Sequence, residues 1–243
     1  LKAPLGFLQA LGWLVKFKPD VILSFGGYIA LPVVLAGWLS RVPVVTHEQT
    51  PVSGLANKII TRFSQKICLS WPQSVKFFPK DKVVLTGNPV RKEIFKVQKS
   101  SQFPVPSSQF PLIYITGGNL GSHVVNEAVA QVLPQLLEKY TLVHQCGDSQ
   151  VYRDFEKLKM AKEKLPVDLQ KRYFLTKYVE SEQIGEILGN ADLVISRAGA
   201  NIVVELLALG KPAIFIPLPW AKEQAKNAQI LVDLGAAVIL PQQ

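Results

Sequence analysis

The sequence predicts an α/β protein with parallel sheets. Short apolar runs recur along the chain with helical segments between them, and glycine, proline or asparagine residues flank these runs. Strands and helices that alternate in this way form parallel sheets whose two faces are covered by helices. The expected strands are residues 20–24, 42–46, 66–70, 82–86, 111–116, 141–146, 172–178, 192–196, 212–217 and 236–240.

A polar stretch that contains two prolines, KVQKSSQFPVPSSQF at residues 96–110, separates the first four expected strands from the other six. Such a composition is typical of a linker. We therefore expect two Rossmann-like domains, at residues 1–96 and 111–243, joined by a linker at residues 97–110. In open α/β sheets ligands bind beyond the carboxyl ends of the strands, so the loops at those ends are the candidate sites.

The composition indicates a globular protein, since 48% of the 243 residues are hydrophobic and 19% are charged. The net charge of +9 attracts phosphates, nucleic acid or an anionic membrane surface, and alone it does not choose among them. No aromatic and basic motif of the kind that binds nucleic acid accompanies the charge, so we expect no nucleic-acid partner.

One uncharged run, Val21–Ser40, has the length of a membrane-spanning helix. Gly26, Gly27 and Pro32 interrupt it, and its first part is typical of a strand. A buried strand, a glycine turn and a buried helix are therefore the favoured interpretation.

The stretch from Asp192 to Asn227 is typical of a site for a nucleoside diphosphate. Gly199 lies in a tight turn between an apolar strand and a helix, where backbone N–H groups and the helix dipole favour a phosphate. Glu205 follows one turn into the helix, where its carboxylate can accept hydrogen bonds from the two hydroxyls of a ribose. Glu223 and Gln224, in the loop after the next strand, are candidates for contact with a sugar.

Six motifs in series resemble those of the MurG-type glycosyltransferases. They are KPDVILSFGGYIALP, PVVTHEQTPVSGLANK, TGNPVRKEIF, ITGGNLGSHVVN, DLVISRAGANIVVELLALGKPAIFIPLP and KEQAKNAQ. Members of that family transfer N-acetylglucosamine from UDP-N-acetylglucosamine to the undecaprenyl-linked muramyl pentapeptide, lipid I, to form lipid II. The resemblance implies the GT-B glycosyltransferase fold with an incomplete first domain. The family's first strand and its glycine-rich, histidine-bearing loop would precede Leu1, and its closing helices would follow Gln243.

The resemblance implies how a UDP-N-acetylglucosamine donor would be bound. Arg91 and the glycine turn at 117–118 would face the diphosphate, backbone groups at Val179 would face the uracil, and Gln224 would contact the sugar hydroxyls. Asn119 replaces the family's usual serine, so it would have to donate through its amide. Ile202 and Glu223 replace the usual threonine and glutamine or histidine, and we expect weaker donor binding from these two changes. The implied donor residues are Arg91, Gly117, Gly118, Asn119, Val179, Gly199, Ala200, Asn201, Ile202, Glu205, Glu223 and Gln224.

The resemblance also implies an acceptor site for lipid I, with His47 and Glu48 as candidate general bases. Thr50 stands where the family prefers asparagine or aspartate, and the family's best candidate for the base lies in the loop expected before Leu1. The implied acceptor residues are Gly26, Gly27, Tyr28, His47, Glu48 and Thr50. The sequence has no Asp-x-Asp pair and no Cys/His cluster, so we expect no metal ion and no cofactor.

Contact with a membrane would require only a surface patch, because the polyprenyl tail of lipid I stays in the bilayer. Phe7 and Trp38 are the expected patch residues, among other apolar residues with lysine and arginine nearby, although a buried position in the core is an equally good interpretation. The predicted location is the cytoplasmic face of the bacterial cell membrane, with peripheral attachment to its anionic surface.

Two alternatives remain open at the level of the sequence. One is another GT-B enzyme that uses a UDP-sugar, such as a diacylglycerol glycosyltransferase or a UDP-N-acetylglucosamine epimerase. The other is a fragment that binds a UDP-sugar without catalysis. The motif at residues 47–49, followed by residues 54–58, favours lipid I as the acceptor.

Overall fold

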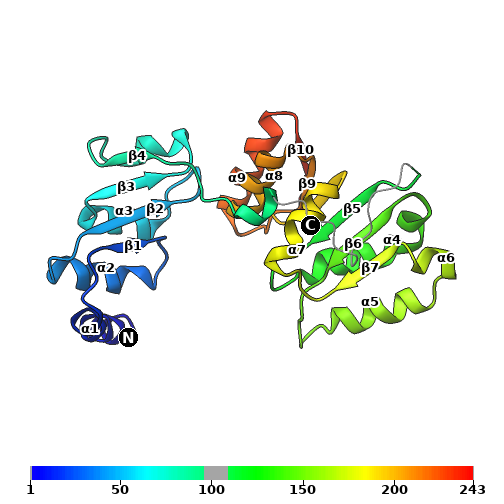
Figure 1. Ribbon diagram of the computed structural model, residues 1–243, viewed down its shortest axis with the longest axis horizontal. Coiled ribbons are helices and arrows are strands. Elements are labelled where there is room, and N and C mark those ends of the chain that lie inside the picture. The colour runs from blue at the N-terminus through cyan, green and yellow to red at the C-terminus, as the bar shows by residue number, and fades with distance from the viewer. Residues whose placement is uncertain (1, 96–108, 243) are drawn as a thin grey trace. The chain divides into compact units, whose positions relative to one another are not determined.

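The computed structural model describes residues 2–95 and 109–242, which form two compact units, Leu1–Pro89 and Val90–Gln243 (Figure 1). The linker predicted at 97–110 falls mostly on residues 96–108, which lie outside the described residues. The first unit ends at Pro89, so the short 3-10 helix η2 (Lys92–Phe95) that follows belongs to the second unit.

The first unit contains a parallel four-stranded sheet in the order β1-β2-β3-β4. Helices α2 and α3 pack on this sheet and on each other, and α1 packs on α2. The core contains Val34, Val44 and Ile60, one from each of α2, β2 and α3. In chain order the elements are α1 (Lys2–Phe17), β1 (Ile22–Ser24), α2 (Ala30–Leu39), β2 (Val44–Glu48), α3 (Leu55–Phe63), β3 (Lys66–Leu69), η1 (Pro72–Phe77) and β4 (Val83–Leu85).

The uncharged run at 21–40 forms strand β1, a turn that contains Gly26 and Gly27, and helix α2, as the sequence predicts. Both glycines have a φ of 81°, a backbone conformation that L-residues with a side chain rarely adopt. Across the described part of the chain, none of the helices combines the length and the apolar character needed to span a membrane.

The second unit contains a parallel six-stranded sheet in the order β10-β9-β8-β5-β6-β7. Helices α4, α5 and α6 pack together on one face of the sheet, and α7, α8 and α9 pack in series on the other (Figure 1). After η2, its elements are β5 (Leu112–Thr116), α4 (His123–Lys139), β6 (Thr141–Gln145), α5 (Asp154–Glu163), α6 (Val167–Gln170), β7 (Tyr173–Thr176), α7 (Ser181–Asn190), β8 (Leu193–Ser196), α8 (Ala200–Leu209), β9 (Ala213–Phe215), α9 (Lys222–Asp233) and β10 (Ala237–Ile239).

Strand β5 lies at the centre of the second sheet and is buried on both sides. Ile113 and Ile115 pack against α4 in the core of one face, and Tyr114, which alternates with them, is 1% exposed on the other face. Each of the ten strands expected from the sequence is present, with ends that differ by a few residues. The α/β class and the parallel sheets are confirmed.

Candidate functional site

The second sheet reverses its strand order between β5 and β8. Strand β5 pairs with β6 on one side and with β8 on the other, so the loops after β5 and β8 leave toward opposite faces. Thr116 and Ser196, the last residues of these two strands, are register partners. Ligands of open α/β sheets bind at such a switch point, and both predicted glycine turns begin here.

The turn after β5 depends on glycine at two positions. At Gly117 a Cβ would overlap the backbone nitrogen of Ser122, and Gly118 has a φ of 84°. The N–H of Gly118 donates to Thr116 Oγ1 at 3.0 Å. The turn leads into the 17-residue helix α4, whose N-terminus favours an anion, and Asn119 is exposed at its tip.

A second contact joins this turn to the loop after β6. A Cβ at Gly121 would overlap the carbonyl oxygen of Cys146, and a Cβ at Gly147 would lie 2.5 Å from the backbone nitrogen of Gly121. Both glycines have a positive φ, 75° and 79°. The two loops therefore pack backbone against backbone.

The turn after β8 contains Gly199, which is the N-cap of α8, followed by Ala200, Asn201 and Ile202 in its first turn. Arg197 holds this turn to its neighbours, because its guanidinium donates to Ser122 Oγ at 2.6 Å and to the carbonyl of Ile216 at 2.7 Å. Burial lowers the pKa of Arg197. The N-termini of α4 and α8 are thus fixed side by side at the switch point.

Glu205 lies in the second turn of α8 and is 2% exposed. Both of its carboxylate oxygens accept hydrogen bonds from Arg91, from Nε at 2.6 Å and from Nη2 at 2.9 Å. The hydrogen bond to Glu205 raises the pKa of Arg91. The structure thus brings together two residues that the sequence assigned to different parts of the donor, the ribose and the diphosphate.

Tyr114 and Gln145 connect the neighbourhood of this ion pair to the first glycine turn. Tyr114 Oη donates to Gln145 Oε1 at 2.7 Å, and Gln145 Nε2 donates to the carbonyl of Gly118 at 3.4 Å. Burial raises the pKa of Tyr114. The positive charge of Arg91 acts to lower this pKa, and the negative charge of Glu205 acts to raise it. Sequence reasoning missed Tyr114 and Gln145, since both lie inside apolar strands.

The loop between β9 and α9 closes another side of the switch point. Gln224 is half-buried and accepts a hydrogen bond from the Leu218 N–H at 3.1 Å, whereas Glu223 is exposed. Asn227 donates to the carbonyl of Ala198 at 3.1 Å and so ties α9 to the Gly199 turn. Val179 is half-buried and follows the end of β7 by three residues, at the edge of the sheet.

A buried polar network between α4, β6 and α5 stabilises the loops after β5 and β6. Asn126 donates to the carbonyl of Cys146 and to Asp154, both at 2.9 Å, and its side-chain oxygen lies 3.0 Å from His144 Nε2. Burial lowers the pKa of His144 to about 4, so the ring is neutral at pH 7. Nε2 then donates to Asn126, and Nδ1 accepts from Tyr173 Oη at 2.8 Å.

In the first unit the predicted acceptor residues gather at the carboxyl edge of the four-stranded sheet. Glu48, the last residue of β2, is 4% exposed and is surrounded by donors. Oε1 accepts from the N–H and the hydroxyl of Thr50, at 3.2 and 2.8 Å, and Oε2 accepts from the Gly54 N–H at 3.3 Å and from Asn57 at 2.9 Å. The carboxylate therefore organises the loop that leads into α3.

His47 is 5% exposed and lies beside Glu48 on β2. Its Nε2 is 3.0 Å from the carbonyl of Gly87, so Nε2 carries the proton and donates. Its Nδ1 is buried and has no hydrogen-bond partner among the described residues. The histidine thus joins the end of β2 to the turn that follows β4.

The glycine turn after β1 lies against the start of helix α3. A Cβ at Gly26 would overlap the amide of Asn57, so glycine is needed for this close approach. Gly27 is exposed, and Tyr28 is 86% exposed. Asn57 lies within a motif that resembles the family, but its contact with Glu48 and Gly26 could not be foreseen from its position.

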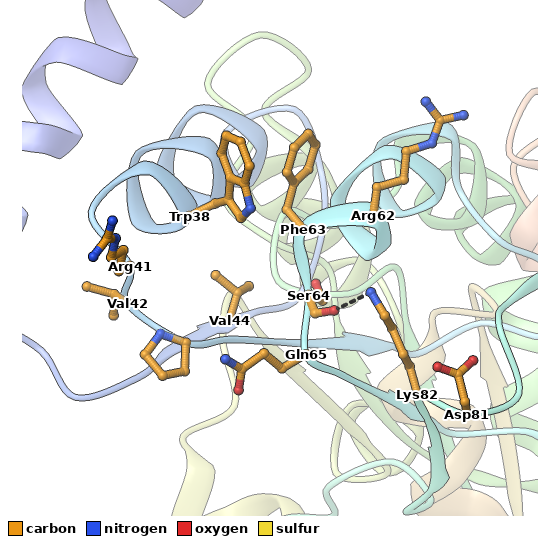
Figure 2. Close-up of a pocket in the computed structure, with 11 residues that line it drawn as sticks. Trp38, Arg41, Val42, Val44, Arg62, Phe63, Ser64, Gln65, Asp81 and Lys82 are labelled. Carbon is orange, nitrogen blue, oxygen red and sulfur yellow. Dashed lines mark hydrogen bonds between the residues drawn. The ribbon is translucent and has the colours of Figure 1, made fainter.

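A shallow pocket of about 590 Å³ lies at the opposite edge of this sheet, at the amino ends of β2, β3 and β4 (Figure 2). Trp38 and Phe63 pack edge to face at its rim, with ring centroids 5.3 Å apart. Lys82 donates to the carbonyl of Ser64 at 2.9 Å, whereas Arg41 and Arg62 point outward. These charges do not converge on one point.

Of the two predicted membrane-patch residues, Trp38 is 56% exposed and Phe7 is half-buried in α1. The outer face of α1 carries further apolar side chains. The exposed members are Leu5, Leu8, Trp13, Val15 and Phe17.

Known proteins resemble this chain along almost its whole length. It is 43% identical over 230 residues to a UDP-N-acetylglucosamine--N-acetylmuramyl-(pentapeptide) pyrophosphoryl-undecaprenol N-acetylglucosamine transferase of Bacillus cereus, and 38% identical over 228 residues to one of Clostridium botulinum. These matches cover 93% of this chain and 60% of each relative. The chain therefore spans about three fifths of the length of these curated relatives.

Solved structures agree with this result. The crystal structure of MurG from Acinetobacter baumannii is 32% identical with a TM-score of 0.68, and the match covers 99% of this chain and 64% of that one. The UDP-GlcNAc 2-epimerase of Neisseria meningitidis superposes with a TM-score of 0.76 at 17% identity over 99% of this chain and 69% of that one, which shows a shared fold alone.

Family models match both units. The glycosyltransferase family 28 N-terminal domain matches residues 1–69, and the glycosyltransferase family 28 C-terminal domain matches residues 112–243, which is more than half of the chain. The two parallel sheets and the glycine turns at the switch point fit this assignment. The chain belongs to glycosyltransferase family 28.

Proposed function

We propose that the protein is an inverting glycosyltransferase that moves N-acetylglucosamine from UDP-N-acetylglucosamine to the C4 hydroxyl of the muramyl sugar of undecaprenyl-linked lipid I, which forms lipid II. The similarity to curated transferases of that name, at 43% and 38% identity, supports the substrates. Three of every five residues of such a relative have a counterpart in this chain, so the reaction is proposed for the whole protein.

The observation that carries the proposal is the buried carboxylate of Glu205 behind the Gly199 turn. Glu205 is 2% exposed and lies in the second turn of α8, so a nucleotide with its diphosphate at the N-terminus of this helix would direct its ribose hydroxyls toward the carboxylate. Its donors must come from another side chain or from a ligand, because burial without hydrogen bonds is costly.

In the proposed reaction the C4 oxygen of the muramyl sugar forms a bond to the anomeric carbon as the bond from that carbon to the UDP oxygen breaks. Negative charge grows on the leaving diphosphate, where the N-termini of α4 and α8 and the guanidinium of Arg91 would stabilise it. We place Gly117, Gly118, Asn119, Ala200, Asn201 and Ile202 around the diphosphate, Gln224 and Glu223 at the sugar, and Val179 at the uracil.

The acceptor hydroxyl must lose a proton to a general base. Of the two predicted candidates, Glu48 accepts hydrogen bonds at both oxygens, whereas His47 Nδ1 has no donor among the described residues. We therefore propose a positioning role for Glu48 and keep the base for His47 or for a residue of the whole protein. The exposed Gly27 and Tyr28, with Gly26 and Thr50, would border the acceptor.

A transfer assay with radiolabelled UDP-N-acetylglucosamine and a lipid I analogue tests the proposal. We expect label in the lipid product, and we expect Glu205→Ala to raise the donor KM by about 10- to 100-fold, because the loss of hydrogen bonding to a buried charge costs about 1.5–3 kcal/mol in total. Glu182→Ala, which removes an exposed carboxylate at the start of α7, is the matched control and should keep the KM. Conversion of the donor to its C2 epimer without label in lipid would contradict the transferase assignment.

We further propose peripheral contact with an anionic membrane surface through the outer face of α1 together with Phe7 and Trp38. The exposed apolar side chains of α1 and the nearby Lys16, Lys18 and Arg41 support this surface. Trp13→Ala and Trp38→Ala should each reduce co-sedimentation with vesicles that contain anionic lipid. Trp220→Ala, at a 75% exposed tryptophan of the second unit, is the control. Equal losses in all three variants would contradict a patch on the first unit.

A further inference from the structure

We propose that Arg91 acts as a latch on Glu205, by which we mean that it holds the carboxylate in the free protein and gives up this contact when a nucleotide binds. The ribose diol of the nucleotide displaces the guanidinium from the carboxylate, and the released guanidinium then pairs with the diphosphate of the same ligand. This inference rests on the proposed donor site and adds to it an order of contacts and a competition.

The competition follows from the geometry of the ion pair. Arg91 binds side-on through Nε and Nη2, which donate to the two different oxygens of Glu205 at 2.6 and 2.9 Å. A vicinal diol binds a carboxylate in the same manner, with one hydroxyl on each oxygen. The guanidinium and the diol therefore need the same side of the same carboxylate, and only one of them can occupy it at a time.

The two partners differ in their freedom to move. The side chain of Glu205 is 3% exposed and is held in helix α8, whereas the side chain of Arg91 is 44% exposed. The backbone of Arg91 is anchored nearby, because its carbonyl accepts the Ile94 N–H at 3.3 Å and Ile94 is fully buried where η2 packs on α7 and α8. A long side chain on a fixed backbone can change partner without any rearrangement of the fold.

The diphosphate would lie within the neighbourhood of Arg91. The charge of Arg91 acts on the hydroxyl of Tyr114, which is connected through Gln145 to the carbonyl of Gly118 in the first glycine turn. A guanidinium released from Glu205 would therefore remain beside the turn where the anion is expected. A diphosphate also offers the paired oxygens that a guanidinium fork binds best, so the cation exchanges one anion for another.

The latch makes the two halves of the nucleotide depend on each other. A ligand with a diol and no phosphate must break the ion pair and leaves Arg91 without an anion. A ligand with both groups supplies the replacement partner for each member of the pair. The site would therefore reject free uridine more strongly than the loss of the phosphate contacts alone explains.

The test compares uridine with UDP in the full chain and in the Arg91→Ala variant, with a ligand-observed NMR titration for uridine and calorimetry for UDP. Removal of the competitor should make uridine bind about tenfold tighter, and removal of the phosphate partner should make UDP bind about tenfold weaker. Lys92→Ala, which removes an exposed positive charge from the adjacent position, is the matched control and should leave both affinities within about twofold.

Opposite signs for the two ligands support the latch, since a merely structural role of Arg91 would weaken both. Weaker binding of both ligands to Arg91→Ala would overturn it, with the donor site left in place. Absence of UDP binding in the unmodified chain would instead contradict the donor site itself. Should Arg91→Ala fail to fold, Arg91→Lys keeps the charge without the fork. Tighter uridine binding with UDP affinity within a few-fold then supports the latch, and weaker uridine binding overturns it.

Discussion

Glu48 and Glu205 are both buried carboxylates at the carboxyl edge of a parallel sheet, and their surroundings differ. Glu48 is 4% exposed and accepts from two backbone N–H groups, a hydroxyl and an amide, all within ten residues of it along the chain. Glu205 is 2% exposed, and the hydrogen bonds seen at its carboxylate within the described residues come from one guanidinium, 114 residues away.

This difference separates a structural carboxylate from one that can serve a ligand. The donors around Glu48 belong to the loop that it shapes, so replacing them would unfold that loop. The donor to Glu205 is a half-exposed side chain that can leave while the helix stays in place. Burial and charge alone therefore do not identify a binding carboxylate, whereas the origin of its hydrogen-bond donors does.

The largest expected effect comes from Glu48→Ala, which removes the shared acceptor of the hydrogen bonds from Thr50, Gly54 and the buried Asn57. We expect the free energy of unfolding of the first unit to fall by about 3 kcal/mol. Hydrogen exchange read by mass spectrometry should show faster exchange around residues 48–57, with residues 111–242 unchanged. Normal protection at 48–57 would break the comparison, because Glu48 would then be as dispensable to the fold as a ligand-binding residue.

Lowering the pH should reduce the stability of the second unit through protonation of His144. Its pKa is about 4 in the folded protein, below the ordinary value of 6.5, so the unfolded chain binds more protons between these values. The stabilisation is complete above pH 6.5 and is lost as the pH falls toward 4. We expect a loss of about 2 kcal/mol between pH 7.5 and 5, measured by urea unfolding.

The control for this titration is His144→Gln, which removes the titrating ring. The difference in pH dependence between the two proteins isolates the histidine from the other ionisable groups. Parallel curves for the variant and the unmodified chain would show that the network of Asn126 and Asp154 tolerates a charged ring.

Thr50→Val should have a smaller effect on the first unit. The variant keeps the shape of the side chain and removes one hydroxyl, 2.8 Å from Glu48. We expect a loss of about 1 kcal/mol in thermal or urea unfolding, since the other three hydrogen bonds to Glu48 remain. A loss as large as that of Glu48→Ala would show that the loop depends on this one hydroxyl, which also lies 2.6 Å from the carbonyl oxygen of Val52.

The smallest effect is expected from Ile202→Thr at the start of α8. Ile202 is half-buried, and threonine would place a hydroxyl at the N-terminus that faces the predicted diphosphate. We expect UDP affinity to rise by about two- to fivefold, because one exposed hydrogen bond contributes about 0.5–1 kcal/mol. Calorimetry measures this change, and Ile202→Val, which adds no polar group, is the control.

Strands were predictable from the sequence because parallel strands are buried on both faces and therefore read as short apolar runs. The predicted run at 111–116 became β5, and the run at 192–196 became β8, with ends set by Thr116 and Ser196. The glycine turns were predictable as well, since Gly118 needs a positive φ and Gly117 a close approach of the backbone.

Partners across the fold were not predictable in the same way. The ion pair of Arg91 with Glu205 joins positions 114 residues apart, and neither residue type specifies its partner. In the sequence Tyr114 is an ordinary strand residue, and only the structure shows that its hydroxyl donates a hydrogen bond to Gln145. In the sequence, Glu48 beside His47 indicated acid–base chemistry. Only the folded loop shows that backbone N–H groups of Thr50 and Gly54 donate hydrogen bonds to the Glu48 carboxylate.

The contact of Gly121 with Cys146 and Gly147 involves main-chain atoms alone. This contact, which we call the joint, does not depend on the chemistry of neighbouring side chains, but a Cβ at either glycine would disrupt it. In a saturation library of the whole chain that is selected for folding, positions 121 and 147 should therefore accept almost nothing, while the exposed Leu120 in the same turn accepts many residues. Engineering of the loop for a different donor would have to exchange the tip and leave the joint alone.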